Sequence, residues 1–141
     1  MLKKEELDRI KESIKDAEEN TSGEIRVYVA RHCKGNPLET ASKKFHQLKM
    51  DNTRLRNGVL IYLSIADHKA AIFADDGINQ LVENDNFWQS TLDLMLIYFK
   101  ENEIEKGISK GVEKVGELLK EFFPVTDEVK NELDNEVIIE D

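Results

Sequence analysis

Apolar residues recur at helical spacing in four segments of the chain. In the first segment they are separated by three, four and three positions, which predicts an amphipathic helix over residues 3–19. Similar spacing predicts helices over residues 36–48 and 103–123, and another that Asn84 or Asp85 would cap. The apolar stripe of the first helix consists of Leu7, Ile10, Ile14 and Ala17.

Three segments between these helices have the patterns of β-strands. Residues 24–31 alternate between apolar and polar side chains, which is typical of a strand with one well-buried face. Residues 59–65 are apolar on both faces, as expected of a central strand covered by helices on both sides. The segment 66–68 is short enough to be a hairpin turn into a third strand over residues 69–74.

The order α-β-α-β-β-α-α predicts an α/β fold, a three-layer α/β/α sandwich around a small mixed sheet. We expect one domain over residues 1–124, followed by an acidic C-terminal tail over residues 125–141. The tail carries seven acidic residues and one basic residue. Within it, Val137–Ile139 could dock on the domain as a short strand.

Composition narrows the classes of partner. The net charge of −9 argues against nucleic acids and anionic membranes as partners. The N-terminus has no apolar signal core and no apolar run is long enough to span a bilayer, so we expect a cytoplasmic protein or one trimmed of a targeting segment. We also expect a monomer. The single cysteine, Cys33, excludes an internal disulfide and a cysteine-cluster metal site.

The predicted topology brings several oxygen-bearing side chains to one end of the sheet. The first two strands are joined by a helix and should be parallel, while the hairpin makes the third antiparallel to the second. Thr53, and Asn84 or Asp85, could approach the same end. Carboxylate, amide and hydroxyl oxygens favour a hard divalent cation, and this mixture suits calcium better than magnesium. The acids and amide that the strand ends bring together are Glu24, Asn57, Asp75 and Asp76.

Simpler interpretations stay open for these acids. An Asp-Asp-Gly sequence after a strand is most often an ordinary polar turn. Glu24 could equally pair with Arg26 or Arg56. At the opposite end of the sheet, Asp67 falls near His32 and Cys33, but neighbours on a strand point to opposite faces, so we expect no catalytic cysteine there.

Three segments of the sequence resemble the TPM domain family: SGEIRVYV, RNGVLIYLSIADHKAAIFADDGIN and NDNFW. That family includes thylakoid-lumen acid phosphatases of photosystem II repair, an animal receptor modulator and many bacterial proteins. The resemblance covers roughly Leu2 to Pro124 and is greatest to the short bacterial members. It implies an α/β/α sandwich and an acidic site associated with a divalent metal, with Glu24, Asn57 and Asp75 at matching motif positions. Asp67 matches a recurrent family acid, and Asp76 stands at a more variable position.

The resemblance leaves two functions open. The first is a divalent-cation binding domain, calcium being the preferred ion, that acts as a regulatory or interaction module for a protein partner. The second is a weak metal-dependent acid phosphatase acting on a phosphorylated small molecule, with Arg56 as the phosphate-binding residue. No dedicated nucleophile is evident in the sequence, so hydrolysis would have to use water activated by the metal.

Overall fold

The computed structural model describes residues 2–82, 86–125 and 137–140 and confirms the predicted α/β/α sandwich. Within these ranges, no helix combines the length and apolarity that crossing a bilayer requires. The helices are α1 (Lys4–Glu18), α2 (Pro37–Gln47), α3 (Asp76–Asn79), α4 (Asn86–Lys100) and α5 (Ile104–Phe122). The strands are β1 (Glu24–Ala30), β2 (Gly58–Ser64), β3 (Lys69–Ala74) and β4 (Val137–Glu140).

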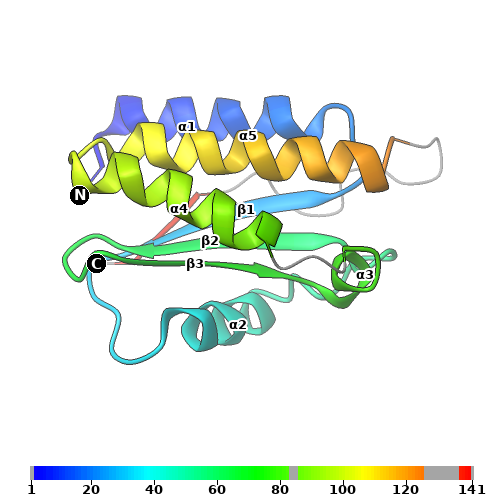
Figure 1. Cartoon of the computed structure of the whole chain (residues 1–141), viewed down its shortest axis with the longest axis horizontal. Coiled ribbons are helices and arrows are strands. Elements are labelled where there is room, and N and C mark those ends of the chain that lie inside the picture. The colour runs from blue at the N-terminus through cyan, green and yellow to red at the C-terminus, as the bar shows by residue number, and fades with distance from the viewer. Residues whose placement is uncertain (1, 83–85, 126–136, 141) are drawn as a thin grey trace.

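The four described strands form one mixed sheet in the order β3-β2-β1-β4. β1 runs parallel to β2 and to β4, while β2 and β3 form the predicted antiparallel hairpin. Helices α1, α4 and α5 cover one face of the sheet, and α2 covers the other (Figure 1). The central position of β2 explains why its sequence is apolar on both faces.

Alternation along the strands divides the core into two parts. Ile25, Val27 and Val29 of β1 belong to the larger cluster, which also includes residues of α1, α4 and α5. Tyr28 and Ala30 belong to the smaller cluster, beneath α2. The sheet is therefore buried on both sides, and polar side chains that serve a function must collect at its ends or edges.

The structure contains two elements, α3 and β4, in addition to the predicted order of helices and strands. The short helix α3 begins at Asp76, where the sequence favoured a turn, because Asp75 serves as its N-cap. The docking of Val137–Ile139 is confirmed, since β4 pairs in parallel with residues 27–30 of β1. The predicted helix caps Asn84 and Asp85, and tail residues 126–136, lie outside the described residues.

Candidate functional site

The predicted site lies at the end of the sheet where β1 and β2 begin and β3 ends. Glu24 is paired with Gly58 across the parallel ladder. On the other side of Gly58, the backbone N–H of Asp75 donates to the Gly58 carbonyl oxygen at 3.0 Å. Three adjacent strands therefore place Glu24, Gly58 and Asp75 in one row, as the predicted topology requires. Both acids are only 2% exposed.

Gly58 keeps the middle of this row free of side-chain atoms. A Cβ at Gly58 would lie 3.1 Å from the Met50 carbonyl oxygen and 3.4 Å from Cε2 of Phe45. The segment that follows α2 thus packs directly over the row, and it carries Thr53 and Asn57 to the same end of the sheet. Both residues are buried, with exposures of 6% and 0%.

Two neutral oxygens at this end have no hydrogen-bond partner among the described residues. They are Oδ1 of Asn57 and Oγ1 of Thr53, and both are buried. The amide nitrogen of Asn57 donates to Ser22 Oγ at 3.4 Å, which fixes which way its oxygen points. Buried polar atoms normally have a hydrogen-bond partner, so these two oxygens are atoms that an ordered water or a ligand would satisfy.

Asp75 is tied to Arg56. Nε of Arg56 donates to Oδ2 of Asp75 at 2.8 Å, and its terminal nitrogen donates to Oδ1 at 3.0 Å. Oδ1 also accepts from the backbone N–H of Asp76 at 2.8 Å, which caps α3. Arg56 itself has a φ of 51°, in the left-handed region, and this unusual backbone turn aims its side chain at Asp75.

Asp76 takes the opposite orientation from Asp75. Its side chain is 77% exposed, and its nearest charged partner, Arg56, lies 3.9 Å away. It occupies the first turn of α3, where a negative charge interacts favourably with the N-terminus of a helix. The two adjacent acids therefore tolerate one another because one is buried against an arginine and the other faces solvent.

A further acid, Glu18 at the end of α1, joins this region although the sequence analysis did not select it. Its Oε2 accepts from the backbone N–H of Ile25 at 2.6 Å, at the start of β1. The pKa of Glu18 is raised to about 8, chiefly by burial and also by the neighbouring Glu24 carboxyl, while the hydrogen bond from the Ile25 N–H and the charge of Arg26 act in the opposite direction. The sequence feature that could have identified Glu18 is its position at the end of the first helix, shortly before the Thr-Ser-Gly segment that leads into Glu24.

The raised pKa of Glu18 predicts that stability falls as pH rises from 4.5 to about 8, because the folded protein holds a proton that the unfolded chain has lost. Glu18→Gln should remove this dependence and raise the melting temperature at pH 8. Glutamine keeps an oxygen for Ile25 and replaces the acidic proton with a permanent N–H. Thermal melts in chelator across this pH range test the prediction, with the exposed Glu19→Gln as the matched control. Parallel pH profiles for all three proteins would contradict it.

At the opposite end of the sheet, the Asp67 carboxylate contacts the backbone of Cys33. Asp67 Oδ2 accepts from the backbone N–H of Cys33 at 2.6 Å, which lowers the pKa of Asp67, and His32 Nδ1 lies 3.5 Å from Asp67 Oδ1. The Cys33 thiol instead lies 3.7 Å from Thr40 Oγ1. Asp67 therefore holds the loop after β1, and the topology keeps it apart from the acidic end, as predicted.

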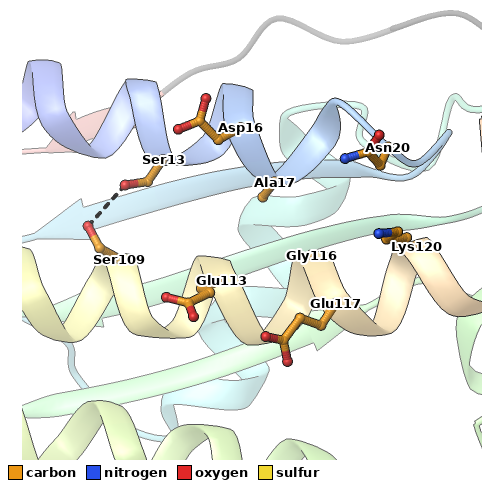
Figure 2. Close-up of a pocket in the computed structure, with 9 residues that line it drawn as sticks. All are labelled: Ser13, Asp16, Ala17, Asn20, Ser109, Glu113, Gly116, Glu117 and Lys120. Atoms are coloured by element: carbon orange, nitrogen blue, oxygen red, sulfur yellow. Dashed lines mark hydrogen bonds between the residues drawn. The ribbon is translucent and has the colours of Figure 1, made fainter.

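A hollow of about 380 Å³ also lies between α1 and α5 (Figure 2). At one end Ser13 Oγ donates to Ser109 Oγ at 3.3 Å. The helices come close because Gly116 has no side chain, and a Cβ there would lie 2.7 Å from that of Ala17. The hollow is an exposed seam between two helices, and its charged residues all face solvent: Asp16, Glu113, Glu117 and Lys120.

Across the described residues, no three Asp, Glu, His or Cys side chains converge in a ready-made metal cluster. Of the predicted ligands, Glu24, Asn57, Thr53 and Asp75 are buried at this end of the sheet, with Gly58 between Glu24 and Asp75, whereas Asp76 faces solvent. The molecule is thus an α/β/α domain with buried acids and unpartnered neutral oxygens where its first two strands begin.

Comparison with known proteins assigns this domain to a family. A family model described as the TPM domain matches residues 1–118, so the chain belongs to the TPM domain family. This confirms the resemblance found in the sequence. A comparison with curated proteins found no match.

Three solved structures share this fold. The NMR structure of the BA42 protein from the psychrophilic bacterium Bizionia argentinensis is 40% identical, with a TM-score of 0.90 over 99% of this chain and 95% of that one. The N-terminal domain of the cg2496 protein from Corynebacterium glutamicum is 10% identical, with a TM-score of 0.66 over 98% and 80%. An N-terminal domain from P. gingivalis is 18% identical, with a TM-score of 0.70 over 86% and 78%. The last two likenesses concern the fold alone.

Proposed function

We propose that this TPM domain binds a divalent cation, calcium in preference to magnesium, and acts as a regulatory or interaction module. The observation that carries the proposal is the pair of buried oxygens without hydrogen-bond partners, Asn57 Oδ1 and Thr53 Oγ1. They lie at the end of the sheet that also buries the acids Glu24 and Asp75. Neutral oxygens combined with carboxylates are the ligands that calcium prefers.

The proposed ligands differ in how each would interact with a bound cation. Glu24, Asn57 and Thr53 would supply the central ligands, because all three are buried. Asp75 would bind the cation with a carboxylate whose two oxygens also accept hydrogen bonds from the Arg56 guanidinium. Asp76 would act mainly through its charge, since its side chain faces solvent. A site of few carboxylates implies modest affinity.

The same geometry favours cation binding over phosphate hydrolysis. Arg56 is the candidate phosphate-binding residue, and its Nε and one terminal nitrogen are engaged by Asp75. A phosphate ester would have to displace a buried carboxylate from this bidentate pair, which is a costly exchange. Weak metal-dependent phosphatase activity is therefore the second proposal, and it would depend on the same cation.

Calcium should raise the melting temperature of the wild-type protein, because it would bind the folded state and not the unfolded chain. At 100 times Kd the expected gain is about 2.7 kcal/mol, and magnesium should give less. Glu24→Gln should lose most of this gain, while the exposed Glu19→Gln should keep it. Thermal melts with and without each ion measure this. No gain in the wild type, or an equal gain in Glu24→Gln, would refute the proposal.

A further inference from the structure

The last strand, β4, covers one edge of the sheet with only four residues. It pairs in parallel with residues 27–30 of β1 and stands at the end of the strand order, where Figure 1 draws it in red. Two of its residues, Ile139 and Glu140, are exposed. The family model matches residues 1–118 and therefore does not include this strand. β4 is thus a short, half-exposed addition at the edge of the matched domain.

The backbone groups of β1 alternate between two neighbours. The Ala30 carbonyl oxygen accepts from the residue that follows β2 at 2.9 Å, and the Arg31 N–H donates to the Glu140 carbonyl oxygen at 3.2 Å. By the alternation of a strand, Tyr28 and Ala30 direct their N–H groups to β2. Val29 and Arg31 direct theirs to β4. Release of β4 would therefore uncover the second set of amides and leave the first set paired.

A carboxylate holds the far end of β4. The phenolic O–H of Tyr28 donates to Oε2 of Glu140, and the Lys44 ammonium, on α2, lies 3.5 Å from the same oxygen. Nζ of Lys44 also lies 5.4 Å from the centre of the Tyr28 ring. The Glu140 side chain is 47% exposed, so this ion pair stabilises the docked strand only modestly.

The first two residues of β4 pack on opposite sides of the sheet. Val137 packs against the larger core cluster and Ile138 against the smaller one. Together with the Glu140 contacts, they define what fits this edge of β1. The matching segment is extended and parallel to β1, with branched apolar residues at its first two positions and a carboxylate at the fourth.

We propose that β4 is a detachable strap, and that the edge of β1 beneath it binds, in its place, an extended segment of a partner protein with the same pattern of branched apolar residues and a carboxylate. Short, exposed edge elements belong to the part of a structure that opens at the least cost. An uncovered strand edge presents a row of N–H and C=O groups that pair readily with another strand. The inference is independent of the proposed cation site and is tested in chelator.

Native-state hydrogen exchange of the full chain tests the strap. The Val29 and Arg31 amides should have protection factors at least about tenfold lower than those of Tyr28 and Ala30, because only the first pair faces β4. Exchange of the first pair should also be insensitive to low urea, since a local opening exposes little surface. Equal protection and equal urea dependence of the four amides would overturn the proposal, because β4 would then leave only when the whole domain unfolds.

Two glutamates supply matched variants. Glu140→Gln and Glu19→Gln each remove one negative charge from an exposed residue, but only Glu140 pairs with Lys44. Glu140→Gln should raise the exchange rates of Val29 and Arg31 about tenfold, and Glu19→Gln should leave them unchanged. Equal rates in the two variants would overturn the proposal, because the carboxylate would then not hold the strap.

Ile138→Asp, which places a charge against the smaller core cluster, should release β4 and open the edge to a peptide. It should remove the protection of Val29 and Arg31 only, and loss of protection throughout the domain would overturn the proposal. A capped peptide with the sequence of residues 136–140 should shift these two amides saturably. A peptide with glutamine in place of the last glutamate should bind about tenfold more weakly.

Three results of the peptide experiment would overturn the proposal. The first is the absence of shifts up to millimolar peptide, and the second is equal binding of the two peptides. The third is a dimer of Ile138→Asp in sedimentation, because a second copy of the chain would then cover the edge.

Discussion

Gly77→Ala should unfold at a markedly lower temperature than the wild type. A Cβ at Gly77 would lie 2.1 Å from the Leu55 carbonyl oxygen and 2.5 Å from that of Arg56. These are backbone atoms, so α3 would have to move away from the loop before β2. Overpacking of this kind costs about 2–3 kcal/mol, or roughly 6–10 °C for a domain of this size. The displacement should also separate Arg56 from Asp75. Thermal melts measure the loss.

Gly111→Ala is the control for the added methyl group. Its Cβ would meet the side chain of Met95, with Sδ at 2.5 Å, and a methionine can change rotamer where a carbonyl cannot. Alanine also favours a helix over glycine by up to about 1 kcal/mol, which offsets part of the strain. The control should therefore lose less stability. Equal losses in both variants would contradict the assignment of Gly77 as a backbone contact.

Asp75→Asn should destabilise the protein strongly, and Asp76→Asn should not. Asparagine at position 75 removes the charge that binds Arg56 in a bidentate pair and leaves its amide nitrogen facing the guanidinium. The expected cost is about 1–3 kcal/mol, as for hydrogen bonds to charged groups. Asp76 is exposed, so its change should fall within about 0.5 kcal/mol. Chemical denaturation in chelator compares the two.

A similar loss in both variants would show that the buried and exposed acids are equivalent, contrary to their surroundings. The comparison also distinguishes the structure from an ordinary polar turn. In such a turn both side chains would be solvated, and neither substitution would cost more than a surface change.

The layers of the fold could be predicted because the spacing of apolar residues along the chain indicates which faces of its helices and strands are buried. The two-sided apolar run of β2 predicts a central strand, and the crossover and hairpin then fix which strand ends meet. That topology placed Glu24, Asn57 and Asp75, from three distant segments, at the same end of the sheet. The helix α3 was missed because four residues are too few to establish a helical period.

The side-chain pairing at the site could not be predicted from the sequence, because it depends on the loop between α2 and β2. Lys49 and Arg56 both adopt left-handed backbone angles there, with φ of 58° and 51°, and neither is a glycine that would have indicated it. This course of the loop backbone brings the Arg56 guanidinium to the Asp75 carboxylate. Glu18 was missed for a different reason: it lies four residues after Ile14, on the apolar face of α1, but glutamate is a residue type that is usually exposed.

The most direct test of cation binding is a calcium titration followed by NMR at the atoms that carry the proposal. The account predicts saturable shifts of the Asn57 side-chain amide and of the Thr53 and Glu24 backbone amides. The same signals should stay unchanged in Glu24→Gln, and they should respond more weakly to magnesium. The titration should extend to about 10 mM, beyond the weakest calcium sites of proteins. If these signals do not move in the wild-type protein at that concentration, the buried oxygens do not form a cation site.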